Sequence, residues 1–389
     1  MREAVIVDAV RTPGGKRNGK LQDWHAVDLA AHVLKAIEER TGIDPAIVDD
    51  VIMGCVMQVG EQSLNIGRNA VLAAGWPESV PATTVDRQCG SSQQALHFAA
   101  QGVIAGAYDV VLAAGVEVMT RTPMGASVVK GMGFPFSETM QSRYEETGLP
   151  PQGIGAEMIA DEYGLSREDL DTFGAESQRR AAVATAEGRF ENEIIPVPVE
   201  IDGKIEMMNA DEGIRLDTTA ESLSKLNPAF REDGKVTAGN SSQISDGASA
   251  VLVMSAEKAA ELGLRARARF HSFAVAGADP VTMLKGPIPV TEKIMARSGL
   301  DVKDIDLFEV NEAFASVVLA WQKEHDTDLS KTNVNGGAIA LGHPLGSSGT
   351  KLMATLLNEL ERTGGRYGLQ TMCEGGGMAN ATIIERIDP

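Results

Sequence analysis

The stretch that decides the fold is Val85-Asp86-Arg87-Gln88-Cys89-Gly90-Ser91-Ser92-Gln93-Gln94-Ala95-Leu96. A short β-branched segment ends here and an apolar helix begins, with one cysteine at the junction. The unpaired N–H groups and the macrodipole of a helix N-terminus favour the thiolate, which is the reactive form of cysteine. Cys89 is therefore a candidate nucleophile. Cysteine is also among the residue types most often buried, so a packing role stays open for this position.

The residues around this junction predict an α/β fold. The helix after Cys89 is apolar around most of its circumference, which predicts that it is buried; its apolar residues are Ala95, Leu96, Phe98, Ala99, Ala100, Val103 and Ile104. The next apolar run, 110–114, is typical of a central parallel strand covered on both faces. Upstream, Leu29, Val33, Ala36 and Ile37 share one helical face, and Gly42 follows as a C′ glycine.

The chain contains two similar halves. The run Arg40-Thr41-Gly42-Ile43-Asp44 aligns with Arg297-Ser298-Gly299-Leu300-Asp301, a shift of 257 (297 − 40). Gly90-Ser91-Ser92 aligns with Gly346-Ser347-Ser348 at a shift of 256, and a second buried-helix pattern follows at Leu352, Met353, Leu356, Leu357 and Leu360. The simplest explanation is a duplicated α/β half-domain, although similarities this short also arise by chance.

A long insertion separates the halves, from about Met119 to Ser245. It is richer in Met, Gly and charge than its surroundings and poorer in strand signal. One helix is expected to begin at Ser166, whose hydroxyl caps it while Asp169 reaches back, whereas residues 131–136 cannot form regular helix. Long insertions in compact enzymes usually carry binding function, so we expect this one to shape a substrate pocket.

Composition excludes several classes of protein. The chain has 389 residues, 43% of them hydrophobic, and a net charge of −19, which argues against nucleic-acid partners and anionic membrane surfaces. Its three cysteines are widely spaced, which suggests neither a disulfide framework nor a zinc site, and we expect no bound metal. The N-terminus carries no signal or transit pattern, and no apolar run is long enough to span a membrane. A cytoplasmic location is the prediction.

Three further stretches near the C-terminus complete the pattern: Asn311-Glu312-Ala313-Phe314-Ala315, Gly342-His343-Pro344-Leu345-Gly346 and Cys373-Glu374-Gly375-Gly376-Gly377. With these motifs in this order, the chain resembles the thiolase family from Val5 to Ile387. The resemblance implies two duplicated half-domains joined as αβαβα, with an inserted loop domain. The expected boundaries are 1–118 plus 246–264 for the N-terminal half, 119–245 for the loop domain that shapes substrate and CoA binding, and 265–389 for the C-terminal half.

The resemblance also assigns roles to the motif residues. Cys89 would attack the 3-oxo carbonyl, His343 would take its proton, and Cys373 would protonate the departing acetyl-CoA enolate. One oxyanion hole would be formed by His343 and a water held by Asn311, the other by the backbone N–H groups of Cys89 and Gly375. Taken singly, these residues also fit ordinary structural roles: a turn histidine, a small core cysteine and a helix-capping asparagine. Cys55 and the other histidines match no catalytic motif.

For coenzyme A, the resemblance points to the loop 237–244, where Ser242 would bind the pantetheine arm and Ala238 would lie beside it. Arg215, Ser222 and Phe230 fall where thiolases contact the nucleotide end, and Met283 matches a pantetheine-contacting methionine. Because CoA is polyanionic and this chain is acidic, a local cation such as Arg215 is physically needed. A solvated surface arginine and a core methionine are the alternatives for Arg215 and Met283.

Two departures from the family pattern bear on function. Pro151-Gln152 stand where acetoacetyl-CoA thiolases carry a His-Met pair, which argues against strict short-chain specificity. Glu374 stands where small or apolar residues are more usual; on a strand its side chain should point away from Cys373, so we expect no catalytic part for it. A charged Glu374 that did face the site would raise the thiol pKa.

The predicted function is thiolytic cleavage of 3-oxoacyl-CoA, as in β-oxidation, with CoA as a substrate and no permanently bound cofactor. The motif sequences are similar to those of degradative thiolases, including actinobacterial ones that act on bulky or steroid side-chain acyl-CoAs. One alternative is a biosynthetic acetoacetyl-CoA thiolase, and another is a non-catalytic, thiolase-like lipid-binding protein. A ketoacyl synthase would be expected to carry two histidines at the site instead of a histidine and a second cysteine. A homodimer or homotetramer is expected.

Overall fold

The first half of the chain builds a five-stranded mixed sheet in the order β4-β3-β5-β8-β1. Its strands β3, β4 and β5 are parallel, and β8 runs antiparallel to both β5 and β1. The elements are β1 (Ala4–Arg11), β2 (Gly15–Lys16), α1 (Ala26–Thr41), β3 (Asp50–Gly54), α2 (Ile66–Ala73), β4 (Ala82–Val85), α3 (Ser91–Ala105), β5 (Val110–Val118), β8 (Ser245–Ser255) and α8 (Ala256–Glu261).

The chain leaves this sheet after β5 and returns to it at β8. The intervening residues form helices, the two longest of which pack on the second half, and one short hairpin, β6 with β7. The elements are α4 (Glu138–Arg143), α5 (Gln152–Glu162), α6 (Arg167–Ala186), β6 (Val197–Ile201), β7 (Lys204–Met208) and α7 (Ala220–Ser224). The capping box predicted at Ser166 and Asp169 is present at the start of α6, and residues 131–136 form no regular helix, as expected.

The second half forms a four-stranded sheet in the order β10-β11-β12-β9. Only β10 and β11 are parallel; the other pairs are antiparallel. The elements are β9 (Ala268–Gly277), α9 (Pro287–Ser298), β10 (Leu307–Val310), α10 (Ala315–His325), α11 (Ala338–Leu341), α12 (Ser348–Thr363), β11 (Tyr367–Glu374) and β12 (Met378–Arg386). Short 3-10 turns lie at Pro45–Ile47, Gly60–Gln62, Val302–Asp304, Leu329–Lys331 and Leu345–Ser347.

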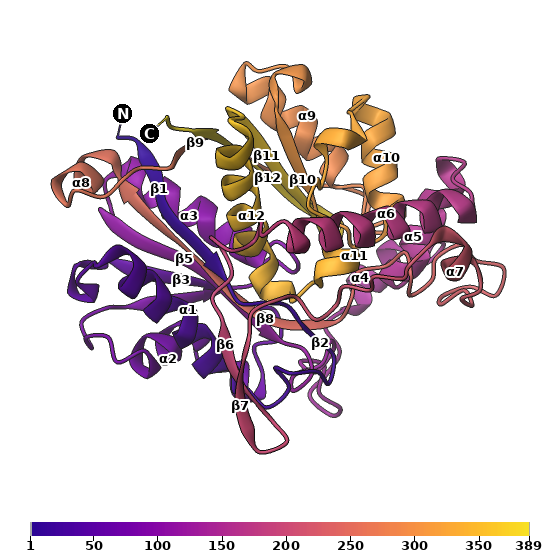
Figure 1. Ribbon diagram of the computed structural model, residues 1–389. Coiled ribbons are helices and arrows are strands. Elements are labelled where there is room, and N and C mark those ends of the chain that lie inside the picture. The colour runs from indigo at the N-terminus through magenta and orange to yellow at the C-terminus, as the bar shows by residue number, and fades with distance from the viewer. Residues whose placement is uncertain (1, 389) are drawn as a thin grey trace.

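The two sheets meet at a narrow seam. The computed structural model describes residues 2–388, and in it β1 pairs with β9 only through Val5 with Arg269 and Ile6 with Ala268. Both chain ends lie beside this seam (Figure 1). Helices α1 and α2 cover the outer face of the first sheet, α9 and α10 cover the second, and α3 and α12 lie between the sheets. The halves together thus form the αβαβα layers of the predicted α/β fold.

The duplication is visible in the element positions. Strand β10, helix α12 and strand β11 begin 257 residues after β3, α3 and β5 respectively, for example at 348 and 91 (348 − 91). The sequence shift of 257 therefore relates whole elements. The two equivalent helices, α3 and α12, pack against each other at the centre of the molecule, which explains why α3 is apolar on most sides and why α12 is buried from Ser348 to Leu360.

Most local expectations for the first half are confirmed. Gly42 ends α1 with φ at 68°, a left-handed conformation that glycine adopts without a Cβ penalty. Every residue of β5 is buried, as expected for a central strand, although β5 is parallel only to β3 and runs antiparallel to β8. Phe98 is an exception, because its side chain is 43% exposed although we expected the whole apolar surface of α3 to be covered.

A buried ionic cluster ties the insertion to both halves. Arg11 at the end of β1 is fully buried, and its guanidinium contacts Glu193 at 2.6 Å and Asp211 at 2.7 Å. Asp211 also accepts the Gly14 N–H at 2.7 Å, and Thr355 of α12 donates to Glu193 at 2.8 Å. Because the charges are paired and hydrogen-bonded, the cluster can persist away from water.

Replacing Asp211 by alanine is expected to lower the free energy of unfolding by about 3–5 kcal/mol, because Arg11 would keep only one buried carboxylate partner. Urea denaturation followed by tryptophan fluorescence measures this. Asp217→Ala is the matched control, since Asp217 is exposed, and its effect should stay within about 0.5 kcal/mol. Equal unfolding midpoints for both variants would contradict a stabilising role for the cluster.

Within residues 2–388, we find no helix that combines the length and the apolar character needed to cross a bilayer. The same residues contain no group of three or more His, Cys, Asp or Glu side chains arranged to hold a metal ion.

Candidate active site

Cys89 lies in a tight turn just before α3. Gln88, which precedes it, has φ at 49°, and such a conformation in a non-glycine residue carries backbone strain. The turn is held by the Ser91 hydroxyl, which donates to the Gln88 carbonyl at 2.6 Å and accepts the Arg87 N–H at 2.9 Å. The sulfur is thereby fixed on the inner side of the turn, where Cys89 is only 5% exposed.

The resting state of Cys89 is a neutral thiol. Burial first, and a charged Glu374 second, raise its pKa to about 12, while the N–H groups of Cys89 and Gly375 oppose the shift. The expectation that the helix N-terminus favours a thiolate at Cys89 is therefore wrong. Cys89 precedes the N-cap residue Gly90, so desolvation outweighs the helix dipole.

Cys373 lies near the end of β11 and faces the same region. It is 1% exposed, and burial together with the nearby Cys89 raises its pKa well above the usual range. Immediately after it, the strand ends in the glycine run predicted to approach a ligand. Gly376 and Gly377 have φ values of 84° and 76°, and a Cβ on Gly377 would come within 2.6 Å of the Ala278 carbonyl oxygen. This turn directs the Gly375 N–H towards Cys89.

His343 is a buried, neutral imidazole. Burial, followed by the charge of Lys351, lowers its pKa to about 3. Its Nδ1 lies 2.5 Å from the Ser348 hydroxyl, which itself donates to the Pro344 carbonyl at 2.9 Å. Since the serine proton is used there, Nδ1 must carry the proton and Nε2 is left with a lone pair. That is the tautomer a general base needs.

Asn311 joins His343 to the strand that carries Cys373. Its Nδ2 lies 3.5 Å from His343 Nε2, and its backbone N–H donates to the carbonyl of Thr371 on β11 at 3.0 Å. Leu345, two residues after His343, lies in one apolar cluster with Cys89. The structure thus brings Cys89, Cys373, His343 and Asn311 together from both halves of the chain.

Two of the residues assigned to CoA lie near this centre. The Ser242 N–H donates to the Ala313 carbonyl at 2.9 Å, two residues beyond Asn311. Met283, with φ at 59°, packs in the same apolar cluster as Cys373. Their positions are compatible with contact along a thioester arm that ends at the two sulfurs.

The other four lie further out, on the surface of the insertion. Arg215, Ser222 and Ala238 are exposed, and Phe230 is 42% exposed while its ring packs edge-to-face on Phe314. The Ser222 hydroxyl caps helix α7 with Thr219, so its side chain already has a local hydrogen-bonding role. We call these four exposed residues the outer rim, and none of them belongs to the apolar clusters that contain Cys89 and Cys373.

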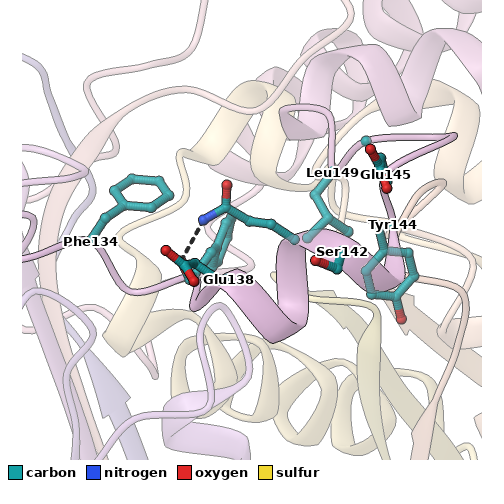
Figure 2. A pocket seen from close by; sticks show the side chains of 9 residues that line it. Phe134, Glu138, Ser142, Tyr144, Glu145 and Leu149 are labelled. Atoms are coloured by element: carbon teal, nitrogen blue, oxygen red, sulfur yellow. Dashed lines mark hydrogen bonds between the residues drawn. The ribbon is translucent and has the colours of Figure 1, made fainter.

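The insertion also holds a hollow of about 730 Å³ along α4 (Figure 2). Phe134, Phe136, Tyr144 and Leu149 supply its apolar lining, and none of the proposed catalytic residues line it. The insertion does reach the site elsewhere, because the Ser127 hydroxyl contacts Met57 of the Cys89 cluster at 3.8 Å.

Sequence reasoning missed several supporting residues. Lys351 is buried in α12 and donates to the carbonyls of Leu341 and Gly342 at 2.6 and 2.9 Å, which holds the turn before His343. Ser348, which fixes the imidazole tautomer, lies in the serine pair that aligns the two repeats. A lysine inside an otherwise apolar helix pattern was the signal that could have identified Lys351.

The sequence matches the thiolase N-terminal domain family over residues 4–257 and the thiolase C-terminal domain family over residues 264–386. It is 51% identical to the steroid 3-ketoacyl-CoA thiolase FadA6 of Mycobacterium tuberculosis, with 100% of this chain and 95% of that protein covered.

Two crystal structures are similar over the full chain. The Bacillus anthracis acetyl-CoA acetyltransferase has a TM-score of 0.91 at 39% identity, with 100% of this chain and 99% of that one covered. The human mitochondrial 3-ketoacyl-CoA thiolase has a TM-score of 0.90 at 38% identity, with the same coverage.

Proposed function

This chain belongs to the thiolase family, and from that premise we propose that it cleaves 3-oxoacyl-CoA with CoA, giving acetyl-CoA and an acyl-CoA two carbons shorter. The observation that carries the proposal is the convergence of two buried thiols and a neutral imidazole from opposite halves of the chain. Such a set supplies a nucleophile, a base and an acid at one carbonyl.

In the first step, Cys89 attacks the 3-oxo carbonyl while His343 Nε2 takes the thiol proton. Because both groups are neutral at rest, proton transfer accompanies attack and no free thiolate accumulates. The N–H groups of Cys89 and Gly375, which lie close enough to the sulfur to lower its pKa, are proposed to stabilise the oxyanion that forms beside it.

In the second step, the carbon–carbon bond breaks and the electron pair leaves as the acetyl-CoA enolate. Its oxygen is proposed to bind to His343 and to a water held by Asn311, and its carbon takes a proton from Cys373. The acyl group stays on Cys89. The proton that His343 took from Cys89 passes to the Cys373 thiolate, so that both groups are neutral again. A CoA thiol then attacks the Cys89 thioester and gives its proton to His343, which returns it to the departing Cys89 sulfur as the shortened acyl-CoA leaves.

The CoA is proposed to extend from this centre past Ser242 and Met283 to the rim at Phe230, Ala238 and Ser222. Its phosphates need a cation on this acidic protein, and exposed Arg215 is the residue we assign to that task. A homodimer or homotetramer and a cytoplasmic location stay predictions.

We further propose that the insertion, residues 119–245, covers the acyl end of the substrate and admits bulky acyl groups. Its first residues contact the Cys89 cluster, and its apolar side chains beyond them are exposed; these are Met124, Val128, Val129, Met132, Phe134 and Phe136. The relative FadA6 is named for a steroid substrate, which supports a large acyl group here.

A biosynthetic acetoacetyl-CoA thiolase is the second candidate, because the Bacillus anthracis neighbour is an acetyl-CoA acetyltransferase. The same residues would then run in the condensing direction, with Cys373 as the base on acetyl-CoA. Pro151 and Gln152 at the start of α5 argue against this alternative, as they replace the His-Met pair of acetoacetyl-CoA thiolases.

Assays with a series of 3-oxoacyl-CoAs of increasing size distinguish the degradative thiolase from the biosynthetic one. With CoA present, we expect turnover of acyl groups longer than acetoacetyl, because the apolar surface of the insertion can accommodate the longer chains. Chromatography of the acyl-CoA products measures this turnover. Activity confined to acetoacetyl-CoA would support the biosynthetic candidate instead. Absence of turnover with every member, together with no acyl adduct on Cys89, would favour the non-catalytic protein.

A further inference from the structure

The Glu374 carboxyl group lies beside the nucleophile. A Cβ added to Gly90, the residue after Cys89, would come within 2.0 Å of Glu374 Oε1 and 2.7 Å of Asn380 Nδ2. Glu374 is fully buried, and neither carboxyl oxygen has a hydrogen-bond partner among the described residues. Strand alternation turns the Glu374 side chain away from Cys373, as expected. The same orientation brings it close to Cys89.

The duplicated half provides a direct comparison. Glu117 on β5 lies 257 positions before Glu374 on β11, and both strands begin at that same shift. The Glu117 carboxylate accepts N–H bonds from Val56, Met57 and Gly346 and one from the Gln62 amide, at 2.7–3.1 Å. Gly346 is itself the repeat counterpart of Gly90. Equivalent carboxyl groups thus lie at equivalent helix starts, and only the one beside the nucleophile lacks donors.

The charged groups around Glu374 are few. Arg87, from the turn before Cys89, places Nη1 4.0 Å from Glu374 Oε2, which is beyond a hydrogen bond. Asp86 of the same turn adds a negative charge, and both catalytic cysteines lie close enough to sense Glu374. The facing strand β12 adds the uncharged Asn380. His97 of α3, which also senses Arg87, has its pKa lowered to about 3 by burial and then by that arginine, so it is neutral.

We propose that Glu374 controls the ionisation of Cys89 electrostatically: it is an uncharged carboxylic acid while the nucleophile works, and its own ionisation suppresses the thiolate. This role rests on the proposed function of Cys89 as the nucleophile. Glu374 acts through Cys89 and does not contact substrate, so it is a positioning residue and not a catalytic one.

The protonation state of Glu374 determines how the reactivity of the Cys89 thiol changes with pH. Burial raises the pKa of Glu374 to about 8, with Arg87 opposing and Asp86 adding to the shift. Below that pH the group is neutral and leaves Cys89 unaffected. Above it, the carboxylate raises the pKa of Cys89 by like-charge repulsion, so thiol reactivity rises less steeply with pH than for an isolated thiol.

The test is alkylation of Cys89 by iodoacetamide, measured by peptide mass spectrometry across pH on the full chain without any CoA ester. For the parent, we expect the logarithm of the rate to bend near the pKa of Glu374. For a coupling of one pKa unit, Glu374→Gln should show no bend and be alkylated about fivefold faster than the parent one pH unit above the pKa of Glu374, and about tenfold faster well above it. Identical profiles for parent and variant would overturn the proposal.

Arg87→Gln is the second variant, because its side chain is partly exposed and its loss does not remove the carboxyl group. Without the nearby cation the carboxylate is less favoured, so the bend should move to higher pH. An unmoved bend would overturn the proposal even if Glu374→Gln failed to fold. Since alkylation needs no acyl substrate, a bend with no thiolysis would count against the proposed function alone.

Discussion

Cys89→Ala is expected to lower thiolysis of 3-oxoacyl-CoA by on the order of 10⁵-fold, because the covalent route disappears with the sulfur. Alanine fits the buried site, since it deletes only the thiol. The residual rate would come from binding and from the N–H groups that remain. Steady-state kcat, measured from product acyl-CoA by chromatography, checks the size of the loss, and brief exposure to acyl-CoA should label Cys89 in the parent only.

Cys55→Ala is the control for this variant. Cys55 is a fully buried thiol of the same half, 3.9 Å from Glu117, and lies outside the proposed chemistry. Its loss should change stability more than kcat. An acyl adduct found on Cys55 or Cys373 in place of Cys89 would show that the nucleophile was assigned to the wrong residue.

The fold could be predicted from sequence because its signals are local and repeated. Continuous apolar strands such as β5, a capped helix such as α6 and the shift of 257 each follow from short patterns that tertiary structure did not override. The exposure of the Phe98 ring could not be predicted, because the apolar pattern of α3 does not show which side of the helix lacks a neighbouring element.

The electrostatics of the site could not be predicted in the same way. A helix N-terminus suggested a low thiol pKa, but the balance depends on burial and on Glu374, which comes from the other half of the chain. The tautomer of His343 depends on where the Ser348 proton goes, and that is a matter of three-dimensional geometry. The sequence motifs identified the candidate residues, but the protonation states of these residues depend on neighbours that only the three-dimensional structure shows.

The repeat also explains why we propose one site per chain. At the shift of 257, Cys373 corresponds to Val116, which has no acid–base group, and at 256 Cys89 is matched by Leu345. The two halves therefore have the same layers but different chemistry. In the proposed mechanism, the first contributes the nucleophile on the turn before α3, and the second contributes the base, the acid and the glycine turn. Catalysis would thus depend on the packing of α3 against α12.

The variant Cys373→Ala is expected to separate two reactions of the proposed mechanism, carbon–carbon bond cleavage and acyl transfer to CoA. Carbon–carbon cleavage is expected to fall by about 10²–10⁴-fold, the usual contribution of a general acid, because the enolate loses its proton donor. Exchange of the acyl group between an acyl-CoA and labelled CoA forms no enolate and needs only Cys89 and His343. We therefore expect exchange to fall by less than about tenfold, which radiolabel transfer to acyl-CoA can measure.

His343→Ala is the matched comparison, because the base serves both reactions. Its loss should depress cleavage and exchange together, by about 10²–10⁴-fold each. If Cys373→Ala lowered both rates to the same extent, Cys373 would be a packing residue whose loss disturbs Cys89, and the acid at the enolate carbon would have to be sought elsewhere. A selective loss of cleavage requires a group that acts on carbon alone, and within the described residues Cys373 is the thiol beside Cys89 that can do so.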